Sequence, residues 1–220
     1  MSTRAESDLF QLITADLYTA VIGDILDAMG RTRQFLPPEI RPLLPQMKLA
    51  GRAMPAVVSD VYGPQKKPFG YLTEALDQLE PGEIYLAPRV SHPVAIWGEI
   101  LTATSQQRGA LGAVVDGYHR DTAQVLTRDF PVFSWGSFAQ DSSVRTIVAD
   151  YRVAVEIGGV RITPGDLIVG DIDGVLVVPR EIESEVIEAA LEKASTENVV
   201  CRAIDNGMSA TEAFARYGVL

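Results

Sequence analysis

Apolar residues recur at helical spacing through the first thirty positions of the chain. Between Asp8 and Met29 they fall three or four residues apart, and Gly30 ends the pattern. A break near Thr14–Asp16 divides the stretch, so we expect one or two helices here. The apolar positions are Leu9, Leu12, Ile13, Leu17, Val21, Ile25, Leu26 and Met29.

The middle of the chain alternates short apolar runs with helical patterns, which is typical of a sheet flanked by helices. Gly109 suits the end of one helix, because glycine adopts the left-handed backbone of a C-terminal cap. The polar segment 63–68 is the best candidate for a mobile loop near a pocket. We expect strands at 51–61, 84–87, 113–115 and 130–135, and helices at 70–79, 98–107 and 122–127.

The pattern changes from Tyr151 onward. Apolar β-branched residues alternate with polar ones between Gly-Gly and Pro-Gly pairs, which predicts a β-meander rather than another strand–helix–strand unit. A long helix at 181–204 and a short one at 210–217 follow. The predicted fold class is therefore α/β, a single domain over residues 1–220 with a mixed sheet and flanking helices.

Composition narrows the class of protein. A chain of 220 residues with 47% hydrophobic residues is long enough to bury roughly 70% of its unfolded surface. No apolar run reaches the roughly 18 residues of a membrane helix, and the first eight residues lack a signal-peptide core. Cys201 is the only cysteine, which excludes an intrachain disulfide. We expect a soluble cytoplasmic protein without a membrane partner.

The net charge of −10 argues against a nucleic-acid surface, which needs a basic stripe. It leaves open an acidic face that docks on a basic protein. His92 and His119 have no third soft ligand at zinc spacing, and we place His119 at a pocket rim. No lysine lies in an apolar strand, which disfavours a Schiff-base aldolase. Residues 170–174 fail the spacing of a calcium loop and predict a β-turn.

Two segments carry candidate chemistry. In Gly98-Glu99-Ile100-Leu101, the free N–H groups of a helix N-terminus can bind a carboxylate, and Gly98 allows close approach. The alternative is a helix start at which Glu99 complements the dipole. The guanidinium of Arg120 can bind an anion, and the carboxylate of Asp121 can coordinate a divalent metal ion. The alternative is an exposed ion pair of little weight.

Neighbouring residues on an extended strand point to opposite faces. We therefore expect Arg120 and Asp121 to find separate partners rather than each other. Together with the helix N-terminus, the two side chains suit a small 2-oxo acid bound to Mg²⁺.

A series of short segments in a fixed order runs through most of the chain. Each is weak by itself, and the ordered set is specific. On this set the chain resembles the RraA-like family, which includes the 4-hydroxy-4-methyl-2-oxoglutarate/4-carboxy-4-hydroxy-2-oxoadipate aldolases. The segments are 98–101, 112–117, 120–121, 131–133, 158–160, 164–166, 171–175 and 217–220.

The resemblance implies a swivelling β/β/α fold and a homotrimer or dimer of trimers with active sites between subunits. It implies that Asp121 is the direct ligand of Mg²⁺ or Mn²⁺, which stabilises the enolate of pyruvate on C–C cleavage. Arg120 and the N–H groups of Gly98, Glu99, Ile100 and Leu101 then bind the substrate carboxylate. Glu99 orients a water of the metal or relays a proton. A neighbouring subunit's long helix supplies a second carboxylate, for which we select Glu197.

One position departs from the family pattern. Members with aldolase activity show an acid, twenty residues, Arg-Asp, two residues and a second acid. This chain has Gln124 in the last place, and an amide neither neutralises Arg120 nor acts as a base. We expect aldol cleavage to be weakened. Decarboxylation of oxaloacetate needs only chelation and enolate stabilisation, so it survives better.

Three functions remain open. The first is a metal-dependent lyase that releases pyruvate, either an aldolase or an oxaloacetate decarboxylase. The second is a non-catalytic regulator that binds a ribonuclease, as some family members do. The third is a lyase or dehydratase on another sugar-derived 2-oxo acid, with 63–68 and 135–138 shaping the pocket. The intact pair Arg120-Asp121 favours catalysis.

Overall fold

A computed structural model describes residues 3–218 of the chain. Met1, Ser2 and the last two residues of the 217–220 segment, Val219 and Leu220, lie outside the described residues. The helices are α1 (Thr3–Asp16), α2 (Thr19–Ala28), α3 (Leu72–Asp77), α4 (Glu99–Gln107), α5 (Thr122–Leu126), α6 (Glu183–Asp205) and α7 (Ala210–Tyr217), with a 3-10 turn at Arg180–Ile182.

Thirteen strands form three sheets in this part of the chain. They are β1 (Arg41–Pro42), β2 (Leu49–Asp60), β3 (Glu83–Ala87), β4 (Ala95–Trp97), β5 (Gly112–Val115), β6 (Tyr118–His119), β7 (Val132–Ser134), β8 (Gly136–Ser137), β9 (Thr146–Tyr151), β10 (Val155–Ile157), β11 (Val160–Ile162), β12 (Leu167–Asp171) and β13 (Gly174–Val178).

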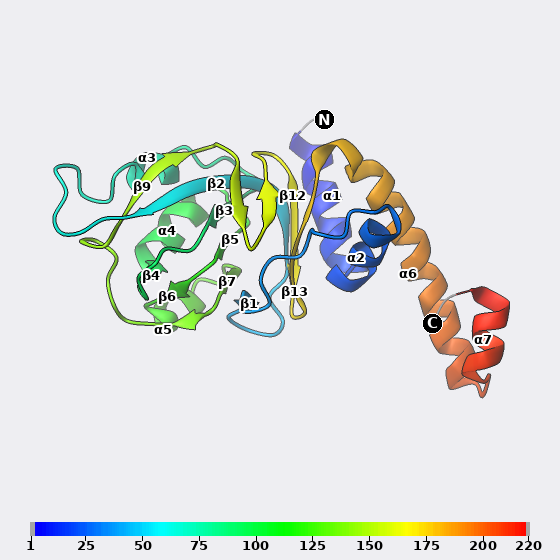
Figure 1. The fold of residues 1–220 in the computed structure, drawn as a ribbon. Helices are drawn as coiled ribbons and strands as arrows, with labels where there is room; N and C mark the ends of the chain where they lie inside the picture. The colour runs from blue at the N-terminus through cyan, green and yellow to red at the C-terminus, as the bar shows by residue number, and fades with distance from the viewer. Residues whose placement is uncertain (1–2, 219–220) are drawn as a thin grey trace.

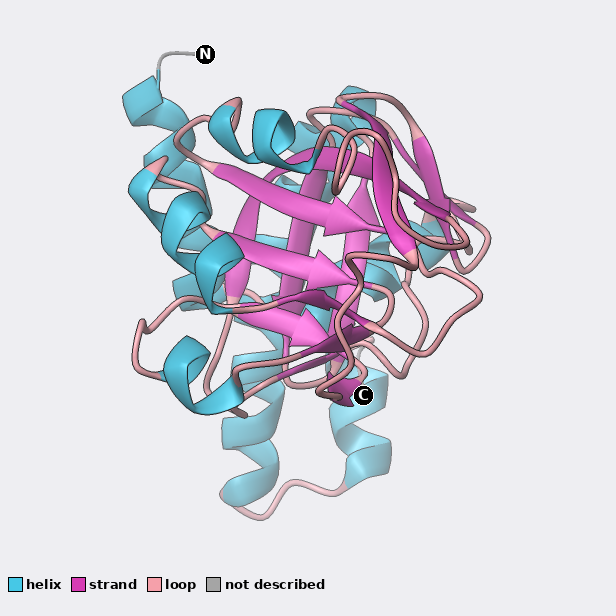
Figure 2. Ribbon diagram, turned by 90° about the vertical axis from the view of Figure 1, so that its left-hand side faces the viewer, coloured by secondary structure: helices cyan, strands magenta, loops and turns pink. Residues whose placement is uncertain are grey.

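The main sheet has the order β1-β7-β5-β3-β2-β12-β13, with β9 paired to β2. Strands β2, β3, β5 and β7 run parallel, while β1, β9 and β12 are antiparallel to their neighbours. Parallel strands need crossover connections, and α3, α4 and α5 fall on these connections. The predicted α/β class with a mixed sheet is confirmed. Figure 2 shows the strands at the centre of the molecule with helices around them.

Each face of the sheet is apolar, so its central strands are buried on both sides. Along β5, Ala113 and Val115 pack in a core with α3, while Val114 faces a second core with the β10–β11 hairpin. Farther along the sheet, β12 and β13 pack against α1, α2 and α6, which lie together beside them in Figure 1. Successive side chains of these strands point to opposite faces of the sheet and therefore pack in separate apolar cores.

The prediction that antiparallel strands, and no further strand–helix–strand unit, follow Tyr151 is confirmed, but these strands do not form a single meander. The β10–β11 hairpin turns at Gly158-Gly159 and forms a sheet of its own, while β12–β13 is a hairpin of the main sheet. Strand β9 pairs with Ala56 to Asp60 of β2, beyond the residues Leu49 to Arg52 that pair with β12. The β-turn predicted at 170–174 is confirmed between Asp171 and Gly174.

The first two helices are separated at Leu17 and Tyr18, directly after the break expected near Thr14–Asp16. Among the described residues no single helix has the length and apolar character to cross a bilayer. Helices α1 and α2 meet that test only as a pair, and they are bent by 102° to one another. Phe10, Ile13 and Val21 of this pair are buried in the core beside β12 and β13.

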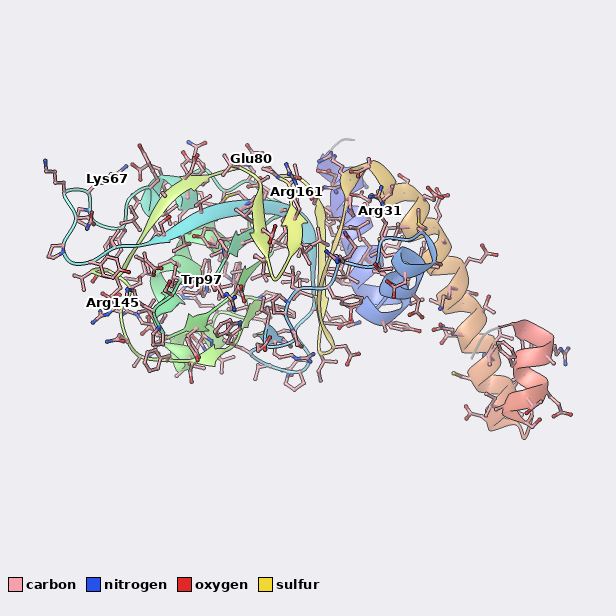
Figure 3. The ribbon with its side chains drawn as sticks, viewed as in Figure 1. Arg31, Lys67, Glu80, Trp97, Arg145 and Arg161 are labelled. Atoms are coloured by element: carbon pink, nitrogen blue, oxygen red, sulfur yellow. The ribbon has the colours of Figure 1, made fainter. Side chains whose placement is uncertain are left out.

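A small parallel sheet of β4, β6 and β8 carries the segment around Arg120. The pattern of apolar residues did not predict β4, β6 and β8, because strands of two or three residues are too short to show a period. Trp97 of β4 lies inside this part of the molecule (Figure 3) and donates from Nε1 to Oγ1 of Thr102 at 2.9 Å. This bond fixes β4 to α4.

His119 ties β6 to its surroundings. Its Nδ1 lies 2.7 Å from Oγ of Ser134, and its Nε2 lies 3.0 Å from Oγ1 of Thr122. The imidazole is buried. The expectation that His119 lies at a pocket rim is wrong, because both ring nitrogens face inward, toward β7 and α5.

A buried ion pair joins β2 to the start of α6. Arg52 Nη2 lies 3.0 Å from Oε1 of Glu183, and Arg52 Nε lies 2.9 Å from Oε1 of Glu6. Removing one partner of a buried pair leaves the other charge without compensation.

We predict that Glu183→Gln lowers the free energy of unfolding by about 3 kcal/mol. Glu185→Gln, an exposed change on the same helical turn, is the matched control and stays within about 0.5 kcal/mol of the parent. Chemical denaturation measures both. Equal effects of the two substitutions would show that the buried pair adds nothing to stability.

We predict a pH dependence of stability from His119. Burial lowers the pKa of its imidazole. Below about pH 6.5 the His119 imidazole is protonated in the unfolded chain but stays neutral in the folded protein. The free energy of unfolding therefore falls as the pH falls. NMR titration of the imidazole, with denaturation at about pH 7.5 and 5.5, tests this. An imidazole that titrates at or above 6.5 contradicts the prediction.

Candidate functional site

A cavity of about 340 Å³ lies where the N-terminus of α4 meets the end of β6. This volume is at the lower end of the range for small-molecule sites, roughly 300 to 1,000 Å³. Its charged lining residues are Arg120, Asp121, Asp141 and Asp77. Its apolar lining residues are Phe69, Leu72, Leu76, Ala95, Ile96, Trp97, Ile100 and Leu101.

Gly98 is required by the close approach of Asp121. Its backbone is extended, with φ −171°, a conformation open to any residue. A Cβ on Gly98 would lie 2.8 Å from Oδ2 of Asp121 and 3.3 Å from Cγ of Arg120. Without that Cβ, Oδ2 of Asp121 accepts a hydrogen bond from the N–H of Glu99 at 3.2 Å. The space beside Gly98, which we expected to admit the carboxylate of a ligand, holds the carboxylate of Asp121.

Asp121 has a left-handed backbone, with φ 57° and ψ 36°. Aspartate is among the few residues that tolerate this conformation. The turn breaks the alternation of the strand, so Arg120 and Asp121 line the same cavity, and Nε of Arg120 lies 3.7 Å from Oδ2 of Asp121. The prediction that the two side chains point to opposite faces is therefore wrong.

Arg120 also contacts Asp141, a residue that the sequence did not single out. Nη1 of Arg120 lies 3.1 Å from Oδ1 of Asp141, which comes from the segment between β8 and β9. Burial favours a higher pKa for Asp141, but a hydrogen bond with Ser143 and the charge of Arg120 outweigh it, and the pKa lies below its usual value. Asp141 is therefore ionised at neutral pH and orients the guanidinium.

The first turn of α4 faces the cavity through Ile100 and Leu101. The N–H groups at the start of a helix have no acceptor within the helix, and they carry the positive end of its dipole. Arg120 and these N–H groups converge on one cavity. The cavity thus has a guanidinium on one side and a helix N-terminus on the other, the two kinds of group that bind anions, and the carboxylate of Asp121 already accepts from one N–H of that terminus.

The predicted residue Glu99, and Gln124 in place of the family's second acid, lie apart from the cavity wall. The carboxylate of Glu99 faces Arg128, with Oε1 3.3 Å from Nη2. Gln124 is exposed on α5. Neither lines the Arg120 cavity, so the structure brings together Gly98, Ile100, Leu101, Arg120 and Asp121 from the predicted set, and adds Asp141.

Asp121 offers one half-exposed carboxylate to the cavity, with a side chain 41% exposed. Among residues 3–218 no group of three or more His, Cys, Asp or Glu side chains is arranged to hold a metal. This donor set does not fit zinc, which takes three or four protein ligands. It fits Mg²⁺ or Mn²⁺, because such ions keep several waters and take one or two carboxylates.

A larger cavity of about 730 Å³ lies at the carboxyl ends of the parallel strands. Its lining includes Arg89, His92 and the buried Asp116, whose Oδ1 accepts from Nε1 of Trp135 at 3.0 Å. Burial raises the pKa of Asp116, against the hydrogen bond from Trp135. This carboxylate is already used within the fold, and the cavity has no helix N-terminus. The Arg120 cavity is therefore the better candidate for chemistry.

The two segments expected to shape the pocket lie elsewhere. Of residues 135–138, Trp135 lines the larger cavity, and none lines the Arg120 cavity. Segment 63–68 lines neither cavity, although Phe69, which follows it, lines the Arg120 cavity. That loop projects from the body at the left of Figure 1, where Figure 3 labels Lys67.

Two relatives match the sequence over different extents. DlpA of Legionella pneumophila subsp. pneumophila is 30% identical over 212 residues, which are 95% of this chain and 33% of DlpA. The chain thus spans about a third of that relative's length. A protein of Halalkalibacterium halodurans named "Putative 4-hydroxy-4-methyl-2-oxoglutarate aldolase" is 33% identical over 142 residues, covering 64% of this chain and 67% of the relative.

Solved structures share the fold. Streptomyces coelicolor RraAS2, described as an unusual member of the RNase ES inhibitor RraA protein family, superposes with a TM-score of 0.78 at 26% identity. The match covers 89% of this chain and 98% of RraAS2. A family model described as RraA-like, Aldolase/RraA, matches residues 19–177, which include Gly98, Arg120, Asp121 and Asp141. The chain belongs to the RraA-like family.

Proposed function

We propose that this protein is a divalent-metal-dependent lyase that cleaves a C–C bond of a small 2-oxo acid and releases pyruvate. The observation that carries the proposal is the convergence of Arg120, Asp121 and the first turn of α4 on one cavity. The aldolase name of the Halalkalibacterium halodurans relative supports this reaction class.

Arg120 and the N–H groups of Ile100 and Leu101 bind the substrate carboxylate. Charge-assisted hydrogen bonds from a guanidinium fix both the position and the orientation of a carboxylate. Asp141 holds the guanidinium at 3.1 Å. The apolar wall at Ile96 and Trp97 keeps water from one side of the site, which strengthens the electrostatic interactions there.

Asp121 would hold Mg²⁺ or Mn²⁺. When bound, the cation supplies Lewis acidity at the 2-oxo group and favours the enolate that C–C cleavage leaves. The bond between C3 and C4 breaks, its electron pair stays on C3, and a proton added to C3 gives pyruvate. In aldol cleavage the C4 hydroxyl loses its proton as C4 becomes the carbonyl of the second product, and in oxaloacetate C4 leaves as carbon dioxide. Decarboxylation of oxaloacetate needs no base for a hydroxyl proton, so Gln124 impairs it less than aldol cleavage.

We also propose a homotrimer or dimer of trimers with active sites between subunits. The end of α6 extends away from the body, and α7 folds against it (Figure 1). Val199, Ile204 and Phe214 on this arm are exposed apolar residues, which supports a contact between copies. Glu197, selected as the donated carboxylate, contacts Tyr18 and Lys193 of its own chain.

A second candidate function is a non-catalytic regulator of a ribonuclease. RraAS2 is described as belonging to an RNase ES inhibitor family. A net charge of −10 suits a basic protein partner. Such a role needs neither turnover nor a cation at Asp121.

We predict that Asp121→Asn lowers pyruvate release from oxaloacetate and from 4-hydroxy-4-methyl-2-oxoglutarate by at least about 100-fold, and that EDTA does the same to the parent. Asp129→Asn is the control, since Asp129 is also left-handed, with φ 48°, and lies outside the cavity. Calorimetry measures the affinity of each protein for Mn²⁺. A folded parent that neither binds Mn²⁺ nor releases pyruvate would favour the regulator.

We predict that Gly98→Ala weakens Mn²⁺ binding and turnover by at least about tenfold, because the new Cβ displaces the carboxylate of Asp121. Gly117→Ala is the matched control, since its Cβ meets Ile96 at an ordinary 3.4 Å. Similar Mn²⁺ affinities in the two variants would contradict the role assigned to Gly98.

A further inference from the structure

We propose that the substrate of the Arg120 cavity is a 2-oxo acid with a single carboxylate and an apolar substituent. The inference rests on the proposed function for the reacting 2-oxo group. It adds a prediction about the other end of the substrate, from the charges and the apolar side chains of the cavity wall.

The cavity has positive charge for only one carboxylate. Among the described residues that line it, Arg120 is the single cation, against Asp77, Asp121 and Asp141. Asp77 is paired with Arg108 at 2.8 Å, outside the cavity. Arg120 already faces Asp141 at 3.1 Å and Asp121 at 3.7 Å. No further lysine, arginine or histidine among these lining residues is available to a second carboxylate.

A divalent ion on Asp121 leads to the same conclusion. Within one subunit, the formal charges of Asp121, Asp141, Arg120 and that ion leave one positive charge, which one substrate carboxylate balances. A carboxylate donated by a neighbouring subunit, as proposed above, would lower that charge further. A second carboxylate on the substrate would make the site negative in a partly desolvated cavity, where uncompensated charge is unfavourable.

The remainder of the wall is mainly apolar, and its uncharged polar side chains are Thr73, Thr104 and Ser142. Phe69, Leu72, Leu76, Ile100 and Leu101 come from α3, α4 and the segment before α3. Ile100 is 75% exposed and Phe69 36% exposed, so the chain itself leaves these side chains uncovered at the cavity. An apolar substituent would cover them, and each buried methylene improves affinity by about fourfold.

The test compares ligands of equal shape and different charge. In 5-methyl-2-oxohexanoate an isopropyl group replaces the second carboxylate of 2-oxoglutarate. With Mg²⁺ present, we expect the 220-residue chain to bind the isopropyl compound at least about tenfold more tightly than 2-oxoglutarate, as measured by calorimetry. This ratio corresponds to the burial of about two methylene groups. Equal or tighter binding of 2-oxoglutarate would overturn the proposal.

A substitution in the protein tests the role of charge with the same two ligands, so that ligand shape does not change. Ile100→Arg places a cation at the mouth, on an exposed side chain whose loss leaves the core intact. We expect it to reverse the preference toward 2-oxoglutarate, whereas Ile100→Met retains the parent preference. An unchanged preference in Ile100→Arg would count against charge as the determinant.

Turnover separates this inference from the proposed function. In 4-hydroxy-4-methyl-2-oxopentanoate, a methyl group replaces one carboxylate of 4-hydroxy-4-methyl-2-oxoglutarate. Cleavage breaks C3–C4, the hydroxyl loses its proton as C4 becomes the carbonyl of acetone, and C3 gains a proton in pyruvate. Preferential binding of the apolar compounds without pyruvate release would support the substrate class and refute the lyase. Pyruvate release from the dicarboxylate alone would refute the substrate class and support the lyase.

Discussion

The candidate site depends on one steric constraint, the absence of a side chain at Gly98. Without a Cβ there, the carboxylate of Asp121 reaches the N-terminus of α4, where the N–H of Glu99 donates to it at 3.2 Å. The left-handed turn at Asp121 makes this reach possible, and the same turn brings Arg120 to the same side. Two adjacent residues thus serve one cavity.

The turn at Asp121 does not lie on the main sheet itself. The strands of that sheet are buried on both faces, and the short β4, β6 and β8 form a separate parallel sheet on which the turn sits. His119 fixes β6 to Ser134 and Thr122, and Trp97 fixes β4 to Thr102. These buried polar contacts orient the residues before and after Gly98 and Arg120, and so limit how the cavity can deform.

Charge divides the cavity into two parts. The end near Arg120 holds two carboxylates, one guanidinium and a helix N-terminus, while the wall toward α3 carries Leu72 and Leu76 together with Thr73 and Asp77. The first part suits a 2-oxo acid and a hydrated divalent ion, and the second selects the remainder of the substrate.

The sequence by itself determined the elements with a strong period, such as β2, β3, β5 and the long α6, and it identified Gly98, Arg120 and Asp121. Hydrophobic periodicity and local motifs are properties of neighbouring residues, so they are visible without a fold. Only the tertiary structure decided that β10–β11 leaves the main sheet, that Arg120 and Asp121 share a face, and that Asp141 joins them. Strand pairing, a left-handed turn and a contact across twenty residues depend on packing between distant segments, which no local pattern encodes.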